Sequence, residues 1–499
     1  MRRLRLLIGL VALSLVLALG ACTGGGQPPI KQLRIGATVA PDSMDPTTNA
    51  NAAIPQALLY NVYETLAKLD SEGKIRPLLA KEWTISNDGL TYTFSLQPNA
   101  TFASGDPVNA DAVIKSFRRI QQDPAVTPVN KAQMAVVASM TAVDDTTVQI
   151  VLSHPSNSWL YDMTGTAGIV IDPAHMDKLA TTPAGSGPYV LGQWTQGASV
   201  TLEASKGYWG TPARFDEVTF RYFADPNAET AAMLSGDLDV ISNSTPQALG
   251  QFADPDKYQV VKGTTNGEIV LGFNDSKAPF DDVRVRQAIC YAIDRKALMN
   301  SVWAGEGMLI GSMVPPTDPW YEDLSGMYPF DPAKAKQLLA DAGHADGLTV
   351  NLQVPTVPYA TESTQFIVSQ LGDVGITVNV TELDFARWID QVMVQGNYDM
   401  TIVAHVEPRD IVKWADPTYY WHYSNADFQS LIQRADAATD QTQYVDLMKQ
   451  AARLLATDAA ADFLWLLPSL MIATPDVTGL PANAVTMSFD LTTIATKGG

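Results

Sequence analysis

The chain has 499 residues, enough for about three domains at roughly 150 residues each. Its 53 Asp and Glu residues outnumber 33 Lys and Arg residues, giving a formal net charge of −20. A negative field of this size repels phosphate groups, so we exclude nucleic acid as a partner.

The N-terminus has the pattern of an export signal. Three arginines among the first five residues precede an apolar run over Leu6–Leu19, and small residues follow before Cys22. This run is shorter than the ~20 residues that a helix needs to span a bilayer, and no later stretch is long and uncharged enough to do so. We predict a signal peptide over residues 1–21 and an extracytoplasmic mature protein.

The sequence around Cys22 resembles a bacterial lipobox, Leu-Gly-Ala-Cys, in which the Cys becomes the lipidated first residue of the mature chain. Residues 22–31 are rich in Gly and Pro and predict a flexible tether. An ordinary secretory signal with an incidental Cys is the alternative. Cys290 is the only other cysteine, so lipidation of Cys22 would leave no intramolecular disulfide and stability would come from core burial.

Alternating apolar residues predict the first strands. Residues 33–39 alternate and then meet Pro41, which predicts a strand that ends in a loop. Residues 83–86 and 90–96 flank the turn sequence Asn87-Asp88-Gly89, which predicts a β-hairpin with one buried face.

The period changes after residue 280. Apolar residues at helical spacing from Val285 to Ile293 predict a helix capped by Asp281 or Asp282. A second helix is predicted to begin at Asp331-Pro332 and to stop at Gly343, since Pro favours the first turn and Gly the end.

Strands and helices then alternate. We predict strands at 348–354, 375–380 and 399–404, with helices around 366–371 and 385–395. Such alternation indicates βαβ units, and therefore a parallel or mixed sheet covered by helices.

Motifs for catalysis, cofactors and metals are largely missing from the sequence. Ser186 lacks the first Gly of a nucleophile elbow, and Gly73-Lys74 is followed by Ile75 where a phosphate loop requires Ser or Thr. The five histidines include no i, i+4 pair, although His405 and His422 remain minor candidates for metal ligation. We predict that the protein is no enzyme and needs no metal or cofactor.

Six segments, spread over most of the mature chain, carry a family resemblance. They are LAKEWTISNDGLTYTFSLQPNATF, GSGPYVLGQWTQGASVTLEASKGYWG, ETAAMLSGDLDVI, FNDSKAPFDDVRVRQAICYAIDRKAL, DPAKAKQLLADAG and VGITVNVTELDFARWIDQVMVQGNYDM. In this order they resemble the oligopeptide and dipeptide receptors of ABC importers, which are the extracellular solute-binding proteins of the peptide and nickel group.

The resemblance implies an α/β, periplasmic-binding-protein-like fold of two lobes (type II, cluster C) with an extra domain in the first lobe. The strands that cross between the lobes are then expected near Leu271–Asn274 and Ala473–Gly479. The implied division is a lobe I core of 32–54, 183–271 and 476–499, an extra domain of 55–182, and lobe II of 272–475.

Ligands of open α/β sheets lie beyond the carboxyl ends of the strands. Three loops follow predicted strands in this way: 40–45, 355–359 and 405–410. Aromatic residues that follow the third loop are candidates to line the same cleft. The predicted ligand contacts are Asp42, Met44, Tyr359, His405, Glu407, Arg409, Asp410, Trp414 and Tyr420.

The third loop departs from the family pattern. The resemblance implies an Asp that pairs with a peptide's amino terminus, but alignment puts Pro408 there, with Glu407 and Asp410 as displaced candidates. Dipeptide receptors also place an Arg near residues 356–359, where this chain has none, and Arg409 is the candidate substitute. A merely solvated loop is the alternative.

The resemblance implies a lipid-anchored, monomeric receptor that captures a solute by hinged closure and delivers it to an ABC permease and its ATPase subunits. A peptide is the expected solute; a metal chelate, haem or oligosaccharide is the alternative. An exported hydrolase and a lipoprotein adhesin or chaperone are the remaining hypotheses.

Overall fold

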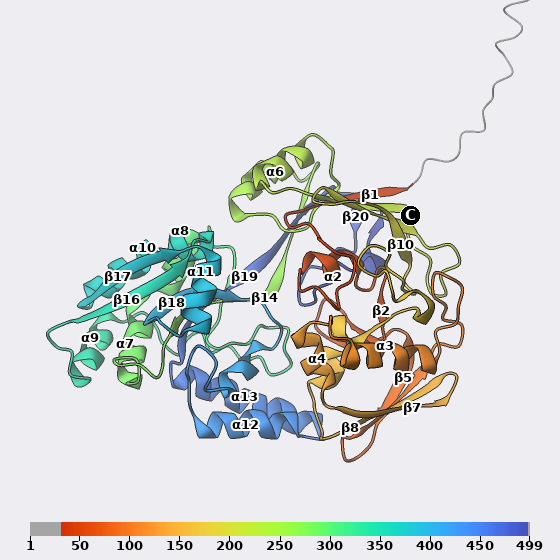
Figure 1. The fold of residues 1–499 in the computed structure, drawn as a ribbon. Helices are drawn as coiled ribbons and strands as arrows, with labels where there is room; N and C mark the ends of the chain where they lie inside the picture. The colour runs from red at the N-terminus through yellow and green to blue at the C-terminus, as the bar shows by residue number, and fades with distance from the viewer. Residues whose placement is uncertain (1–30, 498–499) are drawn as a thin grey trace, which may run out of the picture.

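The computed structural model describes residues 31–497, which form two lobes joined by two long strands (Figure 1). The predicted signal peptide and Cys22 lie outside these residues. One mixed sheet runs through both lobes in the order β10-β11-β12-β1-β13-β19-β14-β18-β16-β17, with β15 (Met308–Leu309) beside β19. Within residues 31–497, none of the helices combines the length and apolarity that a bilayer crossing requires.

The first lobe contains the N-terminal part of this sheet. Strand β1 pairs in parallel with β12 and β13, while β10, β11 and β12 are antiparallel. The elements are β1 (Gln32–Ala37), α2 (Ala53–Leu58), β10 (Tyr189–Thr195), β11 (Ser199–Ala204), β12 (Glu217–Tyr222), α6 (Pro226–Leu234) and β13 (Val240–Ile241). The short strands β20 (Val477–Thr478) and β21 (Ala495–Thr496) pair with each other and bring the end of the chain back to this lobe.

A four-stranded antiparallel sheet, β5-β6-β8-β7, forms a layer against the first lobe. The predicted hairpin is confirmed: β5 and β6 pair around a turn in which Gly89 has φ 70°. Tyr92 and Phe94 are buried there. The elements are β2 (Glu64–Thr65), β3 (Ala67–Leu69), β4 (Ile75–Pro77), β5 (Ala80–Ile85), β6 (Thr91–Leu96), α3 (Ala110–Gln122), α4 (Pro128–Met134), β7 (Val137–Asp144), β8 (Thr147–Leu152), α5 (Trp159–Asp162) and β9 (Ile169–Val170).

The second lobe follows the predicted alternation. Strand β16 pairs in parallel with β17 and β18, and Asp282 and Asp331 cap the two predicted helices with their side chains. The elements are α7 (Val283–Ala292), α8 (Arg295–Val302), α9 (Pro332–Asp341), β16 (Leu348–Pro355), α10 (Pro358–Asp373), β17 (Ile376–Leu383), α11 (Phe385–Trp388) with a π-helical turn (Ile389–Val394), β18 (Met400–His405), α12 (Ala426–Asp436) and α13 (Gln441–Thr457). The expected α/β class is therefore confirmed.

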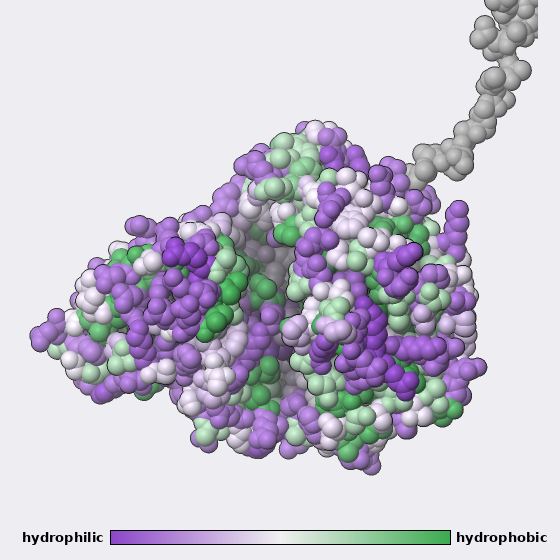
Figure 2. Space-filling model, in the orientation of Figure 1, coloured by the Kyte–Doolittle hydropathy of each residue, from purple (hydrophilic) through white to green (hydrophobic). Residues whose placement is uncertain are grey.

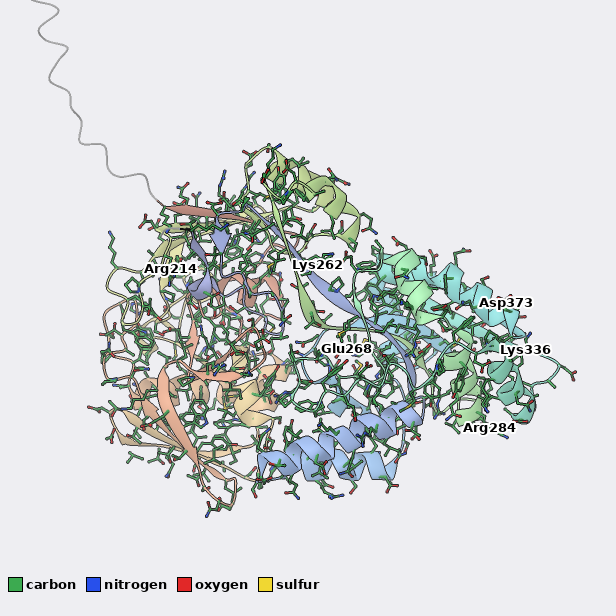
Figure 3. The ribbon with its side chains drawn as sticks, turned by 180° about the vertical axis from the view of Figure 1, so that it is seen from behind. Arg214, Lys262, Glu268, Arg284, Lys336 and Asp373 are labelled. Carbon is green, nitrogen blue, oxygen red and sulfur yellow. The ribbon has the colours of Figure 1, made fainter. Side chains whose placement is uncertain are left out.

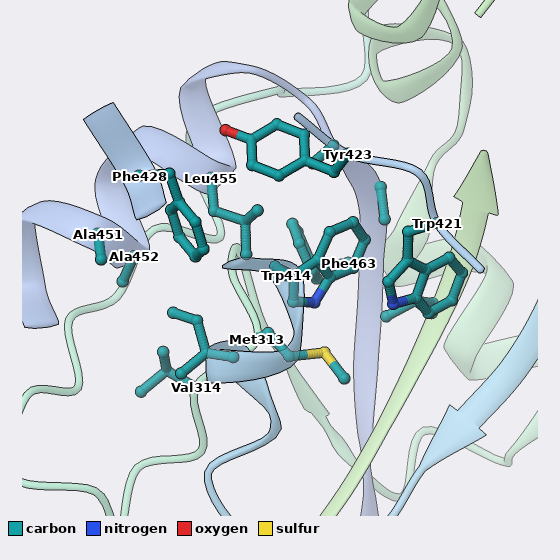
Figure 4. Packing of buried hydrophobic residues seen from close by; sticks show 14 of the residues in the cluster. Met313, Val314, Trp414, Trp421, Tyr423, Phe428, Ala451, Ala452, Leu455 and Phe463 are labelled. Atoms are coloured by element: carbon teal, nitrogen blue, oxygen red, sulfur yellow. The ribbon is translucent and has the colours of Figure 1, made fainter. Parts of the chain in front are cut away.

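An aromatic-rich core fills the second lobe beneath its sheet (Figure 4). The rings of Trp414 and Trp421 stack at 4.8 Å with an interplanar angle of 3°. Phe463, from β19, packs edge-on against Trp414 at 6.0 Å. The long strand is thereby fixed to the lobe through side chains as well as through its backbone pairing.

Strands β14 (Gln259–Phe273) and β19 (Ala461–Ala473) join the lobes as an antiparallel pair. Their regular pairing stops between Thr264 and Glu268 and resumes beyond it. Such an irregularity weakens the ladder locally, so the pair can bend there. The expected crossing near Leu271–Asn274 falls past this point, in the part of β14 that pairs with β18. The predicted division of the chain into lobes stays a prediction.

Candidate functional site: a pocket between the lobes

The surface is hollowed between the two lobes (Figure 2). At the strands that join the lobes lies a pocket of about 420 Å³, lined by residues from both lobes and from both β14 and β19. Small-molecule sites commonly have volumes of about 300–1,000 Å³ and form at junctions of this kind.

The wall from the first lobe follows the carboxyl ends of two neighbouring strands. Thr38 comes directly after β1, and Asn243, Ser244 and Thr245 come shortly after β13. Because β1 and β13 are parallel, these ends meet at one edge of the sheet. The backbone N–H of Ser244 donates to the Leu470 carbonyl at 2.7 Å, which fixes the segment against β19.

The floor of the pocket is the bend in the two joining strands. Thr265 Oγ1 donates to the Leu467 carbonyl at 2.7 Å and accepts from the Gly267 N–H at 2.8 Å. Asn266 donates through Nδ2 to the Val485 carbonyl at 3.2 Å. Side chains therefore satisfy backbone groups where the ladder is interrupted.

The wall from the second lobe is apolar and aromatic. It consists of Trp303, Tyr359 and Val406. Tyr359 is at the start of α10, and burial raises its pKa against the opposing effect of the Ala404 backbone. Val406 is 64% exposed, so its side chain is free to contact a solute.

Next to Val406, the two ends of the loop 405–410, His405 and Asp410, form a buried polar cluster with Tyr420. His405 is hydrogen-bonded through Nδ1 to Asp410 Oδ2 at 2.5 Å and through Nε2 to the Tyr420 hydroxyl at 2.7 Å. Burial alone would raise the pKa of Asp410, but the hydrogen bond and charge of His405, with the charge of Lys413, hold it below its usual value. This carboxylate is therefore held by two partners within the protein, the His405 ring and the Lys413 ammonium.

Glu407 is exposed and forms an ion pair with Lys413. The same ammonium lies 3.0 Å from Asp410 Oδ1. Burial would lower the pKa of Lys413, but the charges of Asp410 and Glu407 raise it above its usual range. Lys413 therefore stays charged and neutralises both carboxylates.

Arg409 is not among the pocket-lining residues, and its side chain bridges the two lobes. Its guanidinium carbon lies 3.5 Å from the centroid of the Tyr161 ring, which belongs to α5, and 4.9 Å from that of Trp320. Asp318 Oδ1 lies 3.8 Å from its Nε. Burial raises the pKa of Asp318 to about 7 against the opposing effect of the Arg409 charge.

The lobes also touch at a second place. Ser156 Oγ donates to Asp436 Oδ1 at 3.1 Å, and Asn157 Nδ2 donates to the Ala435 carbonyl at 3.0 Å. These contacts join the segment after β8 to the end of α12. The cleft is therefore bounded by the joining strands and by a polar interlobe contact.

The remaining predicted contacts lie elsewhere. Trp414 and Tyr420 are 1% and 2% exposed and pack in the core of the second lobe, and Met44 is buried in the core of the first. Asp42 is exposed and accepts hydrogen bonds from Asn49 and Asn51. Tyr359 is the predicted contact that lines the pocket; ligand contact by the others stays a prediction.

Sequence reasoning missed the neutral pocket residues. Asn243 and Thr245 follow β13, a two-residue strand too short to give a hydrophobic pattern. Thr265 and Asn266 belong to the floor because they lie where the pairing of β14 with a strand about 200 residues away is interrupted. Within residues 31–497, no three His, Cys, Asp or Glu side chains are grouped to hold a metal ion.

Comparison with known proteins identifies the family. The model for bacterial extracellular solute-binding proteins, family 5 Middle, matches residues 74–430. This chain belongs to that family. The match confirms the resemblance to solute-binding proteins that is seen in the sequence.

Individual relatives agree over most of the chain. The glutathione-binding protein GsiB of Escherichia coli (strain K12) is 31% identical over 408 residues, which cover 78% of this chain and 76% of that protein. The dipeptide-binding protein of the same strain is 26% identical over 498 residues, covering 90% and 92%. The ABC transporter substrate-binding protein CtaP from Listeria monocytogenes has the same fold, with TM-score 0.83, 22% identity, and coverage of 93% and 99%.

Proposed function

We propose that this protein is the lipid-anchored, extracytoplasmic receptor of an ABC importer and that it captures peptides in the interlobe pocket. The observation that carries the proposal is that both lobes and both joining strands line one pocket. A solute bound there contacts both lobes at once only when they are close together.

Binding then drives closure by population shift. The solute stabilises the closed arrangement because it forms contacts with Thr38 and Asn243 on one side and with Tyr359 on the other only in that arrangement. The interrupted pairing between Thr264 and Glu268 supplies the bend. No covalent bond changes, so the only work of the site is recognition.

A peptide is the solute that the relatives favour. Two of them are named for binding glutathione and dipeptides, which are small molecules rich in amide groups. The pocket offers amide and hydroxyl side chains on one wall and aromatic surface on the other. This combination suits a peptide backbone with an apolar side chain.

Export and anchoring follow from the N-terminal sequence. Lipidation of Cys22 with two acyl chains would hold the receptor stably at the membrane, whereas one chain holds a protein only marginally. A permease with its ATPase subunits then receives the solute. Replacing Cys22 by Ser is expected to release the mature protein from the membrane fraction.

The test is native mass spectrometry of a chain that begins at Thr23, followed by identification of whatever denaturation releases. We expect co-purified peptides. Release of a haem, a metal chelate or a sugar in stoichiometric amount would contradict peptide transport and would identify that molecule as the transported solute. Hydrolysis of added peptides or glycosides would contradict a receptor function.

A further inference from the structure

The two walls of the pocket differ in chemistry. The first lobe contributes Thr38, Asn243 and Thr245, whose side chains end in hydroxyl or amide groups. The second lobe contributes Trp303, Tyr359 and Val406. A solute between them meets neutral hydrogen-bonding groups on one side and apolar surface on the other.

The charged groups near the pocket are already paired with one another. Glu407 and Asp410 both lie against Lys413, and Arg409 stacks on Tyr161 beside Asp318. These contacts give each of these charges a partner within the protein. A free peptide terminus in the pocket would have to break one of these pairs to gain a partner.

The joining strands keep their charges away from the pocket as well. Lys262 lies on β14 (Figure 3). It forms an ion pair with Glu306 at 2.6 Å, and neither residue lines the pocket. Glu268 follows Gly267 of the pocket floor, but its side chain is buried beside Asp410 and Asp318. Burial, with the negative charges of these two neighbours, raises the pKa of Glu268 well above its usual value, which favours the neutral acid.

We propose, on the basis of the peptide function above, that the pocket binds an uncharged amphipathic segment of a peptide. The backbone amides of the segment face Thr38 and Asn243, and its apolar side chain lies against Tyr359 and Trp303. The charged termini of the peptide gain no charged partner in this pocket.

The energetics follow from the cost of desolvation. A neutral amide that exchanges water for the Asn243 amide gains a hydrogen bond of ordinary strength, while an apolar side chain gains from leaving water. A buried charge without a partner costs considerably more than either gain. Peptides that place an internal or chemically blocked segment in the pocket are therefore expected to bind as well as free peptides, or more tightly.

The experiment compares two peptide libraries on the same protein. An equimolar library of free di- to pentapeptides, and the same library acetylated at the amino end and amidated at the carboxyl end, are each incubated with the chain beginning at Thr23. Retained peptides are identified after gel filtration, and affinities of the best pair are measured by calorimetry.

We expect the blocked peptides to bind within about 3-fold of their free counterparts or more tightly, with apolar residues enriched. Retention of free peptides alone would overturn this inference while leaving the peptide function intact. Enrichment of Asp, Glu, Lys or Arg at one position would overturn it too. Retention of neither library would overturn the peptide function, and the inference with it.

A charge placed in the wall gives an independent readout. Asn243→Asp is expected to weaken binding of the best blocked peptide about 10-fold, because the bound peptide would desolvate the new carboxylate without giving it a charged partner. Gln247→Glu is the matched control: it makes the same amide-to-acid change at an exposed residue outside the pocket lining. Equal affinities for the two variants would overturn the assignment of Asn243 to the site.

Discussion

The loop 405–410 and the segment 243–245 follow two strands of one sheet, yet they differ in what they offer a solute. The loop carries four ionisable side chains, which pair mainly with the protein itself. The segment carries a neutral amide and hydroxyls and lines the pocket. Proximity to a cleft is therefore a poor guide to ligand contact unless the side chain also lacks a partner within the protein.

The comparison separates stability from binding. The ionisable side chains of the loop, which pair with one another and with Lys413, are expected to determine the free energy of unfolding and the contact between the lobes. The neutral wall is expected to control affinity. Four changes test this separation, from the largest effect to the smallest.

Asp410→Asn is expected to lower the free energy of unfolding by about 3 kcal/mol, because it leaves His405 and Lys413 without their shared, buried carboxylate. Urea titration measures the loss. Asp373→Asn, at an exposed residue, is the control and should change stability by less than ~0.5 kcal/mol. Equal stability of the two variants would show that the cluster is not structural.

Tyr359→Ala is expected to weaken peptide binding about 10-fold, since it removes the aromatic ring from the second-lobe wall. Calorimetry with a co-purified peptide measures the change. Phe385→Ala removes another aromatic ring, 48% exposed and outside the pocket lining, and should leave affinity unchanged. Similar losses in both variants would place the solute elsewhere in the cleft.

The pH should act on stability more than on affinity. Burial raises the pKa of Asp318 and of Asp162 to about 7, so the folded state takes up protons that the unfolded state does not. This contribution to stability is complete at low pH and is lost as the pH rises through 7, by about 1 kcal/mol per group between pH 6 and 8.

Asp318→Asn should reduce the difference in the free energy of unfolding between pH 6 and pH 8 by about 1 kcal/mol. Urea titration at the two pH values measures this difference. Affinity for a blocked peptide should stay within about 2-fold over the same range, because neutral groups line the pocket. A steep change in affinity with unchanged stability would reverse the roles of the two regions.

Glu407→Gln is expected to have the smallest effect. Its carboxylate is exposed and pairs with Lys413, which retains Asp410 as a partner, so the loss should be less than about 0.5 kcal/mol. Peptide affinity should be unchanged within the error of calorimetry. A 10-fold loss for free peptides, but not for blocked ones, would make Glu407 an amine-binding group after all.

The sequence predicts local structure here better than it predicts the site. Asp331-Pro332 specifies the start of α9 through a side-chain cap, and Asn87-Asp88-Gly89 specifies the hairpin turn, because both signals lie within a few residues. Tyr359 could be placed at the cleft because it begins the helix that follows the carboxyl end of a parallel strand.

Whether a predicted site residue is accessible to a solute depends on contacts between distant segments. Trp414 resembles a ligand-stacking residue in the sequence, but Trp421 and Phe463 enclose it in the core, and Phe463 arrives on a strand far along the chain. Arg409 likewise meets Tyr161 only through the approach of the two lobes. Such tertiary contacts determine whether an aromatic or charged residue is available to a solute, and no local pattern encodes them.

The most direct test of the interlobe pocket is amide hydrogen exchange measured with and without a saturating co-purified peptide. The account predicts that binding protects residues 243–245, the start of α10 and the bend of β14 near Thr265 together, because the solute closes both lobes on these segments. Protection confined to residues 407–410, with no change at 243–245, would contradict it.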